Sequence, residues 1–370
     1  NNLLNENNVS DFHEILIEII NKYEKYSESS ESLDFHEILN NESVVSSWVT
    51  NIGKERVEKA KIAIHNHFKN NFINNDLLSP RDSVYLSGKI VMNETMLYQD
   101  DDLLVINEGT TLELKNSANI IIKGGLQING TKINPVIIKN IDSTNSSIII
   151  LQSPDTVKIN FTKFFNLSSL SYDNWTNTAS LTFYNSNVII KNSEFFNNSK
   201  GDDFVNIVST NSFIIDNCLF SNVISDAIDI DFSNGAISNS RFEYCGNDAI
   251  DVSGSEIIIY NCKVANCNDK AISCGEASSV TINECDIKNS KYGIVSKDLS
   301  NVRSNNSAFH NNNYDFSVYQ KKAEYGIASL IEKNSIGATK ALISSTSKFF
   351  SNNNKIAVII NDSLINTLNQ

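Results

Sequence analysis

Short hydrophobic runs of four to six residues, separated by Asn, Ser and Gly, fill the chain from about residue 85 onward. Many of these runs alternate apolar with polar residues, as in "DAIDID" at 226–231. Such alternation predicts strands that point every second side chain into a core. Helical periodicity of useful length is missing from this region until the end of the chain. We therefore predict a mainly β protein from about residue 85.

Residues 1–80 have a different pattern, which favours helix. The segment "DFHEILIEIINKYEKY" places apolar residues on one face at helical spacing: Phe12, Ile15, Leu16, Ile19, Ile20 and Tyr23. The hexamer "DFHEIL" occurs at 11–16 and again at 34–39, which fits two similar helix starts or a duplicated docking motif. Ser79-Pro80 ends the region, because the residue before a proline disfavours helix. We predict a helical N-terminal region or cap over 1–80.

An internal repeat determines the predicted architecture. The segments "VIIKNSEFFNN", "FIIDNCLFSNV", "AISNSRFEYCG" and "IIIYNCKVANC" align without gaps, and two more follow. Their shared position holds Asn192, Asn217, Asn239, Asn261, Glu284 and Asn306. The repeat of about 22 residues, with three short strands and no helix, is too short for a propeller blade and lacks the leucine-rich pattern. A parallel β-helix, with one coil per repeat, is the remaining solution.

The aligned columns fit stacked coils. Asn tolerates the left-handed conformation at a turn, and its amide can bond to the equivalent amide of the next coil, forming a stack of asparagines. The next column contains small residues, and we interpret Cys218, Cys262 and Cys285 as packing residues rather than redox or metal sites. A third column is predicted to fill the core: Phe195, Phe220, Phe242, Val264, Ile287 and Phe309.

These N-[SC]-x-[FVI] coils resemble the right-handed parallel β-helix, or pectate-lyase-like, superfamily. The segment at 103–140, with its G-L-x-x-x-G-T and P-V-x-I elements, resembles the first coils of such proteins. The resemblance implies a right-handed solenoid over 81–330, and dividing the chain from 85 to the C-terminal cap by the repeat period predicts about ten coils. At 331–370 the period is lost, and because a solenoid must cover its last coil we predict a capping segment there. Lyases, hydrolases, epimerases, adhesins and fibres share this fold, and no catalytic motif of the family is present.

The third strand of each coil is where we look for function. The copies "DFVNIV" (203–208), "DAIDID" (226–231), "DAIDVS" (248–253), "KAISCG" (270–275), "YGIVSK" (292–297) and "YDFSVY" (314–319) align. Strict alternation points the small residues Ala227, Ala249 and Ala271 outward, as a shallow trough for an extended polymer. Asn206 and Asp231 would line it, so these five residues are the predicted substrate-binding set.

Asp229 and Asp251 would stand one strand spacing apart on this outward face, which is unfavourable for two like charges. Three explanations stay open: both carboxylates are solvated, or Asp229, Asp231 and Asp251 bind a cation such as Ca²⁺, or one carboxylate is a general acid or base. Lys297 and Tyr319 lie further along the same face and have suitable acid or base chemistry. The predicted catalytic set is therefore Asp229, Asp251, Lys297 and Tyr319.

Two functions follow as hypotheses. In the first, the sheet binds an extracellular polysaccharide and modifies it by lyase or epimerase chemistry with Ca²⁺, in a secreted or cell-surface protein. In the second, the chain is a non-enzymatic structural or adhesive solenoid that self-associates through its N-terminal helices. The net charge of −13 argues against nucleic-acid partners, which need clustered Lys and Arg. No apolar run in the sequence approaches the length of a transmembrane helix.

Overall fold

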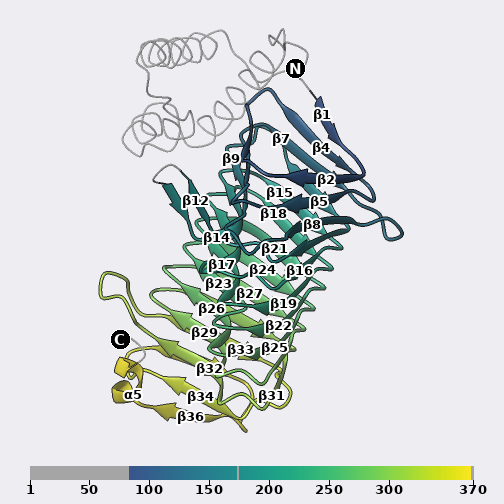
Figure 1. The fold of residues 1–370 in the computed structure, drawn as a ribbon. Helices are drawn as coiled ribbons and strands as arrows, with labels where there is room; N and C mark the ends of the chain where they lie inside the picture. Colours follow the sequence, from purple (N-terminus) through teal and green to yellow (C-terminus); the bar gives the residue numbers. More distant parts are fainter. Residues whose placement is uncertain (1–82, 173–174, 368–370) are drawn as a thin grey trace, which may run out of the picture. The chain divides into compact units, whose positions relative to one another are not determined.

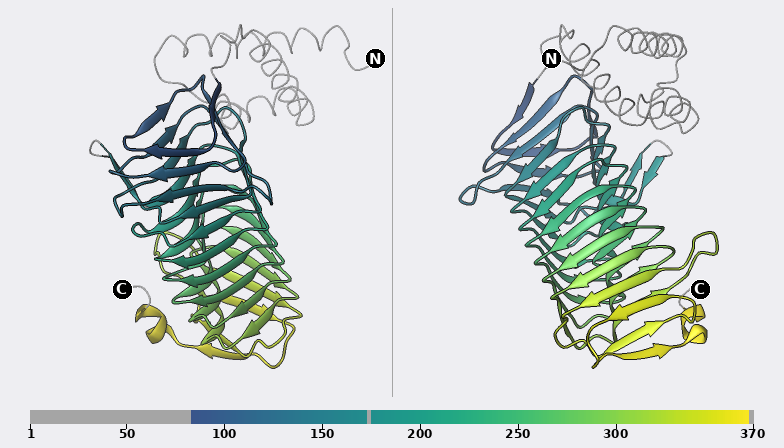
Figure 2. Two further views of the ribbon diagram at one scale, coloured as in Figure 1. Left: turned by 45° about the vertical axis from the view of Figure 1, so that its right-hand side comes forward. Right: turned by 180° about the vertical axis from the view of Figure 1, so that it is seen from behind.

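The computed structural model describes residues 83–172 and 175–367. The predicted helical region 1–80 lies outside the described residues. The described chain winds through three parallel sheets in succession, so each turn contributes one strand to each sheet over most of the length (Figure 1). Figure 2 shows the stacked turns from two further sides. Each sheet is named here by a letter.

The strands of sheet A, in spatial order, are β1 (Ser83–Leu86), β4 (Leu103–Asn107), β7 (Gly125–Asn129), β10 (Val157–Asn160), β15 (Val188–Lys191), β18 (Phe213–Asp216), β21 (Asn234–Ser238), β24 (Glu256–Tyr260), β27 (Ser279–Asn283), β30 (Asn301–Asn305), β33 (Ser329–Lys333) and β35 (Lys348–Ser351). The strands of sheet B are β2 (Lys89–Met92), β5 (Thr111–Leu114), β8 (Val136–Asn140), β11 (Thr162–Phe165), β16 (Glu194–Phe196), β19 (Leu219–Val223), β22 (Arg241–Cys245), β25 (Lys263–Cys267), β28 (Asp286–Lys288) and β31 (Ala308–His310).

Sheet C contains the strands that were predicted to carry function. Its strands are β3 (Met96–Tyr98), β6 (Ile120–Ile122), β9 (Ile148–Leu151), β14 (Ala179–Tyr184), β17 (Asp203–Val208), β20 (Asp226–Asp231), β23 (Ile250–Ser253), β26 (Lys270–Gly275), β29 (Tyr292–Lys297), β32 (Tyr314–Tyr319), β34 (Lys340–Ile343) and β36 (Ala357–Ile360). A separate antiparallel hairpin, β12 (Leu170–Tyr172) and β13 (Trp175–Asn177), precedes β14, and the helix α5 (Asp362–Thr367) follows β36.

The predicted count of about ten coils is wrong. Sheets A and C contain twelve strands each, which gives about twelve turns. The count fell short because residues 331–370 were predicted to be a cap and were not counted, although Asn334-Ser335 repeats the turn dipeptide and the strands β34, β35 and β36 continue the sheets. Backbone pairing needs no particular side chain, so the stacking continues after the sequence repeat has faded.

The predicted core columns are confirmed. The six residues of the third column are all buried, and the rings of Phe164, Phe195 and Phe220 stack in succession with centroids 4.9 and 4.3 Å apart. Cys218, Cys262 and Cys285 are likewise buried in the main hydrophobic cluster. The six shared turn positions have φ between 50° and 56°, the left-handed conformation predicted for the asparagines. In the described part of the chain, no helix is long and apolar enough to cross a membrane.

Candidate functional site

The start of each sheet C strand turns a corner, and this corner changes which side chains face outward. The register pairs Asp203 with Asp226 and Val205 with Ile228, but it does not pair the residues between them. At this corner two successive side chains, such as Ala227 and Ile228, both enter the main core cluster.

The prediction that Ala227, Ala249 and Ala271 face outward is therefore wrong. All three side chains are fully buried in the core, and the equivalent Phe204 packs its ring edge against Phe195 at 5.4 Å. Strict alternation fails because the chain bends between the first and third residue of each copy. The small residues fit the tight inside of this corner, so they leave no trough on the surface.

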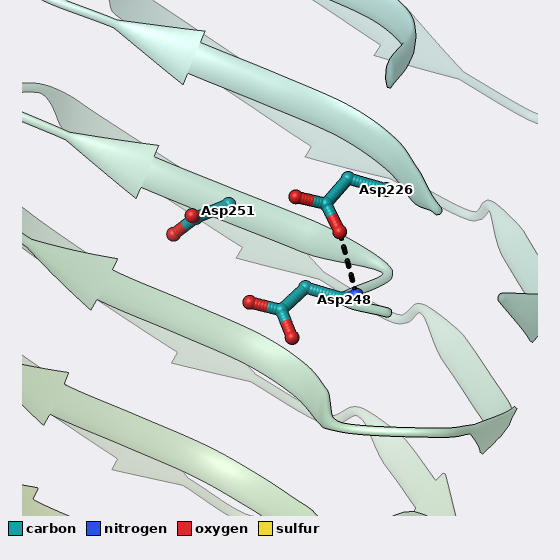
Figure 3. A group of neighbouring side chains, drawn as sticks. All are labelled: Asp226, Asp248 and Asp251. Atoms are coloured by element: carbon teal, nitrogen blue, oxygen red, sulfur yellow. Dashed lines mark hydrogen bonds between the residues drawn. The ribbon is translucent and has the colours of Figure 1, made fainter. Parts of the chain in front are cut away.

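The bend brings the first residue of each copy to the outer side of sheet C, where Asp203, Asp226 and Asp248 are still buried, at 1–7% exposed. Asp203, Asp226 and Asp248 begin three consecutive copies, and sequence reasoning did not include them in the site. Figure 3 shows Asp226 and Asp248 beside Asp251 on this outer side. One carboxylate oxygen from each of these three residues lies within 4.8 Å of the other two. The repeated initial Asp of "DAID" was the signal that could have identified them, had the corner been recognised.

The carboxylates are held by hydrogen bonds that pass from turn to turn. Asp226 Oδ1 accepts a bond from the backbone N–H of Asp248 at 2.7 Å (Figure 3), and Asp248 Oδ1 accepts one from the N–H of Lys270 at 2.9 Å. Each side chain therefore satisfies a backbone donor of the following turn. Removing one of these carboxylates would leave a buried N–H without its partner.

The predicted juxtaposition of Asp229 and Asp251 is confirmed, because the two residues are register partners on β20 and β23. Asn206 is the partner of Asp229 on the other side, and its Nδ2 donates to Asp229 Oδ2 at 3.0 Å. Asp231 lies at the end of the same strand, opposite Ser253. We name the outer side of sheet C at the following residues the acidic face: Asp203, Asp226, Asp229, Asp231, Asp248 and Asp251.

Burial and mutual repulsion raise the pKa of most of these carboxyl groups. Desolvation, followed by the charge of Asp226, raises the pKa of Asp203 to about 8. Desolvation, followed by the charge of Asp203, raises the pKa of Asp229 to about 9. For Asp226 the pKa rises to about 7, through desolvation and the charge of Asp248. Several of these groups therefore retain protons near neutral pH.

Two lysines approach the acidic face from the following turns. Lys270 Nζ lies 3.3 Å from Asp248 Oδ2 and also contacts Asp269. Lys297 Nζ lies 3.8 Å from Asp251 Oδ1, two turns away along sheet C. Desolvation is the largest single influence and lowers the pKa of Lys297, but Asp251, Tyr319 and Asp248 together outweigh it, so the pKa of Lys297 is raised. Lys297 therefore keeps its positive charge.

A glycine allows Lys297 to cross the intervening turn. A Cβ on Gly275 would lie 2.7 Å from Lys297 Cε, so the aliphatic part of the lysine occupies the space where a side chain would be. Tyr319, on β32, is the register partner of Lys297 and is only 2% exposed. Burial raises the pKa of Tyr319 to about 12, so its hydroxyl stays protonated.

Other segments close the acidic face at both ends. On one side, Asn177 of β13 donates from Nδ2 to Thr182 Oγ1 of β14 at 2.6 Å, and the hairpin projects beside sheet C (Figures 1 and 2). On the other side, Ile365 of α5 packs in a second apolar cluster, together with Tyr292, Val295, Tyr319 and Leu342. The predicted sites Lys297 and Tyr319 are thus at the covered end of the face rather than in open solvent.

Comparison with known proteins agrees with this architecture. Residues 203–369 match the family model described as "Right handed beta helix region". Together with the parallel turns, this match confirms the resemblance predicted from the repeat: the described chain is a right-handed parallel β-helix. A comparison with curated protein sequences finds no significant match.

Several solved structures are similar in fold. An alginate lyase from Paenibacillus sp. str. FPU-7 is 10% identical with a TM-score of 0.43, over 70% of this chain and 91% of that one. A double mutant of the periplasmic alginate epimerase AlgG is 13% identical with a TM-score of 0.44, over 76% of this chain and 84% of that one. A rhamnogalacturonan lyase is 10% identical with a TM-score of 0.33, over 71% and 78%. At these identities and TM-scores, the likenesses carry no conclusion about this chain.

Proposed function

We propose that the acidic face binds a segment of an extended, uronate-containing polysaccharide and modifies it by proton transfer, as a lyase or an epimerase does. The observation that supports this proposal is the register pair Asp229–Asp251, with Lys297 Nζ 3.8 Å from Asp251. One member of the pair holds a proton at neutral pH, and the other lies beside a fixed positive charge. Two neighbouring carboxyl groups in such different environments are typical of acid–base catalysis.

The proposed reaction begins with removal of the proton at C5 of a uronate sugar. The C–H electron pair moves into the sugar carboxylate, and the resulting negative charge is stabilised by the Lys297 ammonium. In a lyase the pair then forms a C4–C5 double bond as the C4–oxygen bond breaks, and the leaving oxygen takes a proton. In an epimerase a proton returns to C5 from the opposite face.

We assign these steps to three residues. Asp251 is the base, because it is the carboxylate that contacts Lys297 and its side chain is 24% exposed. Asp229 is the acid, since a pKa of about 9 keeps it protonated at neutral pH. Lys297 contributes charge rather than proton transfer, because its pKa is raised. Because Tyr319 is buried, we assign it a positioning role beside Lys297 and no step in the proton transfer.

The predicted Ca²⁺ becomes part of this proposal with a different set of carboxylates. Asp226, Asp248 and Asp251 offer oxygens within 4.8 Å of one another, the ligand type that Ca²⁺ prefers. The Lys270 ammonium already neutralises part of the charge at Asp248. A bound cation would reduce the repulsion between the acidic face and an anionic sugar.

A panel of polyuronates tests the proposal. The wild-type chain should generate unsaturated sugar ends, seen as ultraviolet absorbance, or change the uronate configuration, seen by NMR, and added Ca²⁺ should enhance either activity. The Asp251→Asn and Asp229→Asn variants should lose activity, while Asp216→Asn, on sheet A, should keep it. Inactivity of the wild-type chain on every polyuronate, with and without Ca²⁺, would instead favour the structural or adhesive solenoid. A polysaccharide substrate also agrees with the proposed secreted or cell-surface location.

A further inference from the structure

A second face of the solenoid has the opposite charge character. A groove of about 730 Å³ follows the corner where sheet A gives way to sheet B. Four cationic side chains line it, namely Lys132, Lys163, Arg241 and Lys263, against one carboxylate, Glu194. In a chain with a net charge of −13, this concentration of positive charge stands out. The groove is distinct from the acidic face, which belongs to sheet C.

The floor of the groove consists of short turns between the two sheets. Four dipeptides line it in successive turns: Asn192-Ser193, Asn217-Cys218, Asn239-Ser240 and Asn261-Cys262. The amides are joined in two pairs, since Asn217 Nδ2 donates to Asn192 Oδ1 at 2.7 Å and Asn261 Nδ2 donates to Asn239 Oδ1 at 2.8 Å. Asn239 Nδ2 donates to Asp216 Oδ1 at 2.8 Å. An amide nitrogen carries two hydrogens, and each of these bonds uses one. The floor therefore retains donors that suit hydroxyl or carboxylate oxygens.

One wall of the groove is a register column of sheet B. Glu194, Leu219, Arg241 and Lys263 follow one another on the neighbouring strands β16, β19, β22 and β25. Lys163 precedes them on β11, and its Nζ pairs with Glu194 Oε2 at 3.0 Å, which neutralises the only carboxylate of the lining. The longer β7–β8 connection, with Lys132 and Pro135, closes one end.

The spacing of the charges indicates a linear ligand. From the turn at Phe161 to the turn at Asn261 the groove passes five turns, which is about 19 Å at the usual strand spacing. Arg241 and Lys263 occupy adjacent turns, and Lys132 and Lys163 lie toward the other end. Leu219 lies between them and Phe161 lies in the same turn as Lys163, and both offer apolar surface for the C–H faces of sugar rings.

We propose that this groove binds an anionic polysaccharide along the solenoid axis. Its carboxylate or sulfate groups pair with Arg241 and Lys263, and its hydroxyl groups accept hydrogen bonds from the turn asparagines. Arg241 is suited to this role because its side chain is 56% exposed, and its Nε pairs with Glu243 at 3.4 Å. The remaining guanidinium N–H groups can bind a carboxylate through two parallel bonds. This binding is independent of any chemistry at the acidic face.

Binding of fluorescently labelled polygalacturonate to the full chain tests the proposal, with dextran as the neutral comparison. We expect wild-type binding to polygalacturonate only, and weaker binding as salt is added. Arg241→Ala combined with Lys263→Ala should lower the affinity about fivefold to tenfold, because two exposed charge pairs are lost. The matched control combines Lys158→Ala and Lys288→Ala, which removes the same charge from exposed positions outside the groove.

Asp251→Asn separates this groove from the acidic face. If the groove binds the polymer, Asp251→Asn retains that binding even where it abolishes turnover. The proposal is overturned if wild-type protein does not bind polygalacturonate, if dextran binds equally well, or if the control pair weakens binding as much as the groove pair. Circular dichroism of each variant verifies that the solenoid is intact.

Discussion

Replacement of Asp226 by Asn tests the electrostatics of the acidic face most sharply. Desolvation and the neighbouring Asp248 raise the pKa of Asp226 from an ordinary 3.8 to about 7, and Asp226 is 7% exposed. The shift of about three units corresponds to about 4 kcal/mol at roughly 1.4 kcal/mol per unit. An asparagine removes the charge and still offers an oxygen to the N–H of Asp248, which Asp226 accepts at 2.7 Å.

The sign of the pH dependence follows from proton linkage. Between about pH 4 and about pH 7 the folded chain keeps the Asp226 proton that the unfolded chain has lost, so wild-type stability falls as the pH rises through this window. Above about pH 7, wild-type stability falls no further from this group, because Asp226 is ionised in the folded and the unfolded chain. Asp226→Asn should therefore match wild type near pH 4 and exceed it by up to about 4 kcal/mol near pH 8.

Urea unfolding of both proteins from about pH 4 to about pH 9 measures this difference. Asp216→Asn is the control of opposite sign, because a hydrogen bond from Asn239 lowers the pKa of Asp216. That variant should lose stability above about pH 4 rather than gain it. A constant destabilisation of Asp226→Asn at every pH would refute the reasoning, since it would mean that the charge on Asp226 does not destabilise the folded chain.

Three further predictions concern the core, the lysine and the helix. Phe220→Ala should cost about 3–5 kcal/mol in urea unfolding, because it interrupts a stack with centroids 4.3 and 5.0 Å from its neighbours; a cost below 1 kcal/mol would contradict the packed column. Gly275→Ala should displace Lys297 from Asp251, since the new Cβ would meet Lys297 Cε at 2.7 Å, and turnover should fall about 100-fold with little change in Tm. Ile365→Ala should release α5, detected as faster hydrogen exchange in 362–367 with the exchange of β20 unchanged.

The repeat made the solenoid and its core predictable because stacking imposes one residue type on each column. Phe195 and Phe220 recur for packing reasons alone, and the turn asparagines recur because few residues tolerate positive φ. The corner at Ala227 was not predictable from alternation, since the bend depends on how two sheets meet. That single bend moved the alanines into the core and placed Asp226 and Asp248 beside Asp251, where both are buried.

The contacts of long side chains could not be predicted from the sequence either. Lys297 reaches Asp251 across an intervening turn, and only the space above Gly275 reveals that path. The apolar cluster around Ile365 joins the end of the chain to Tyr319, residues that no periodic pattern connects. Sequence reasoning therefore identified Asp229 and Asp251 as neighbours on adjacent strands, but it misjudged what surrounds them.

The central claim is that Asp251 removes the proton at C5 of a uronate, with Asp229 as the acid and Lys297 supplying positive charge. Incubation of a polyuronate panel with the protein in heavy water, followed by NMR and mass spectrometry of the sugars, tests it directly. The account predicts deuterium at C5 or unsaturated ends for wild type, and neither for Asp251→Asn. Unchanged sugars after incubation with wild-type protein that binds them would contradict it.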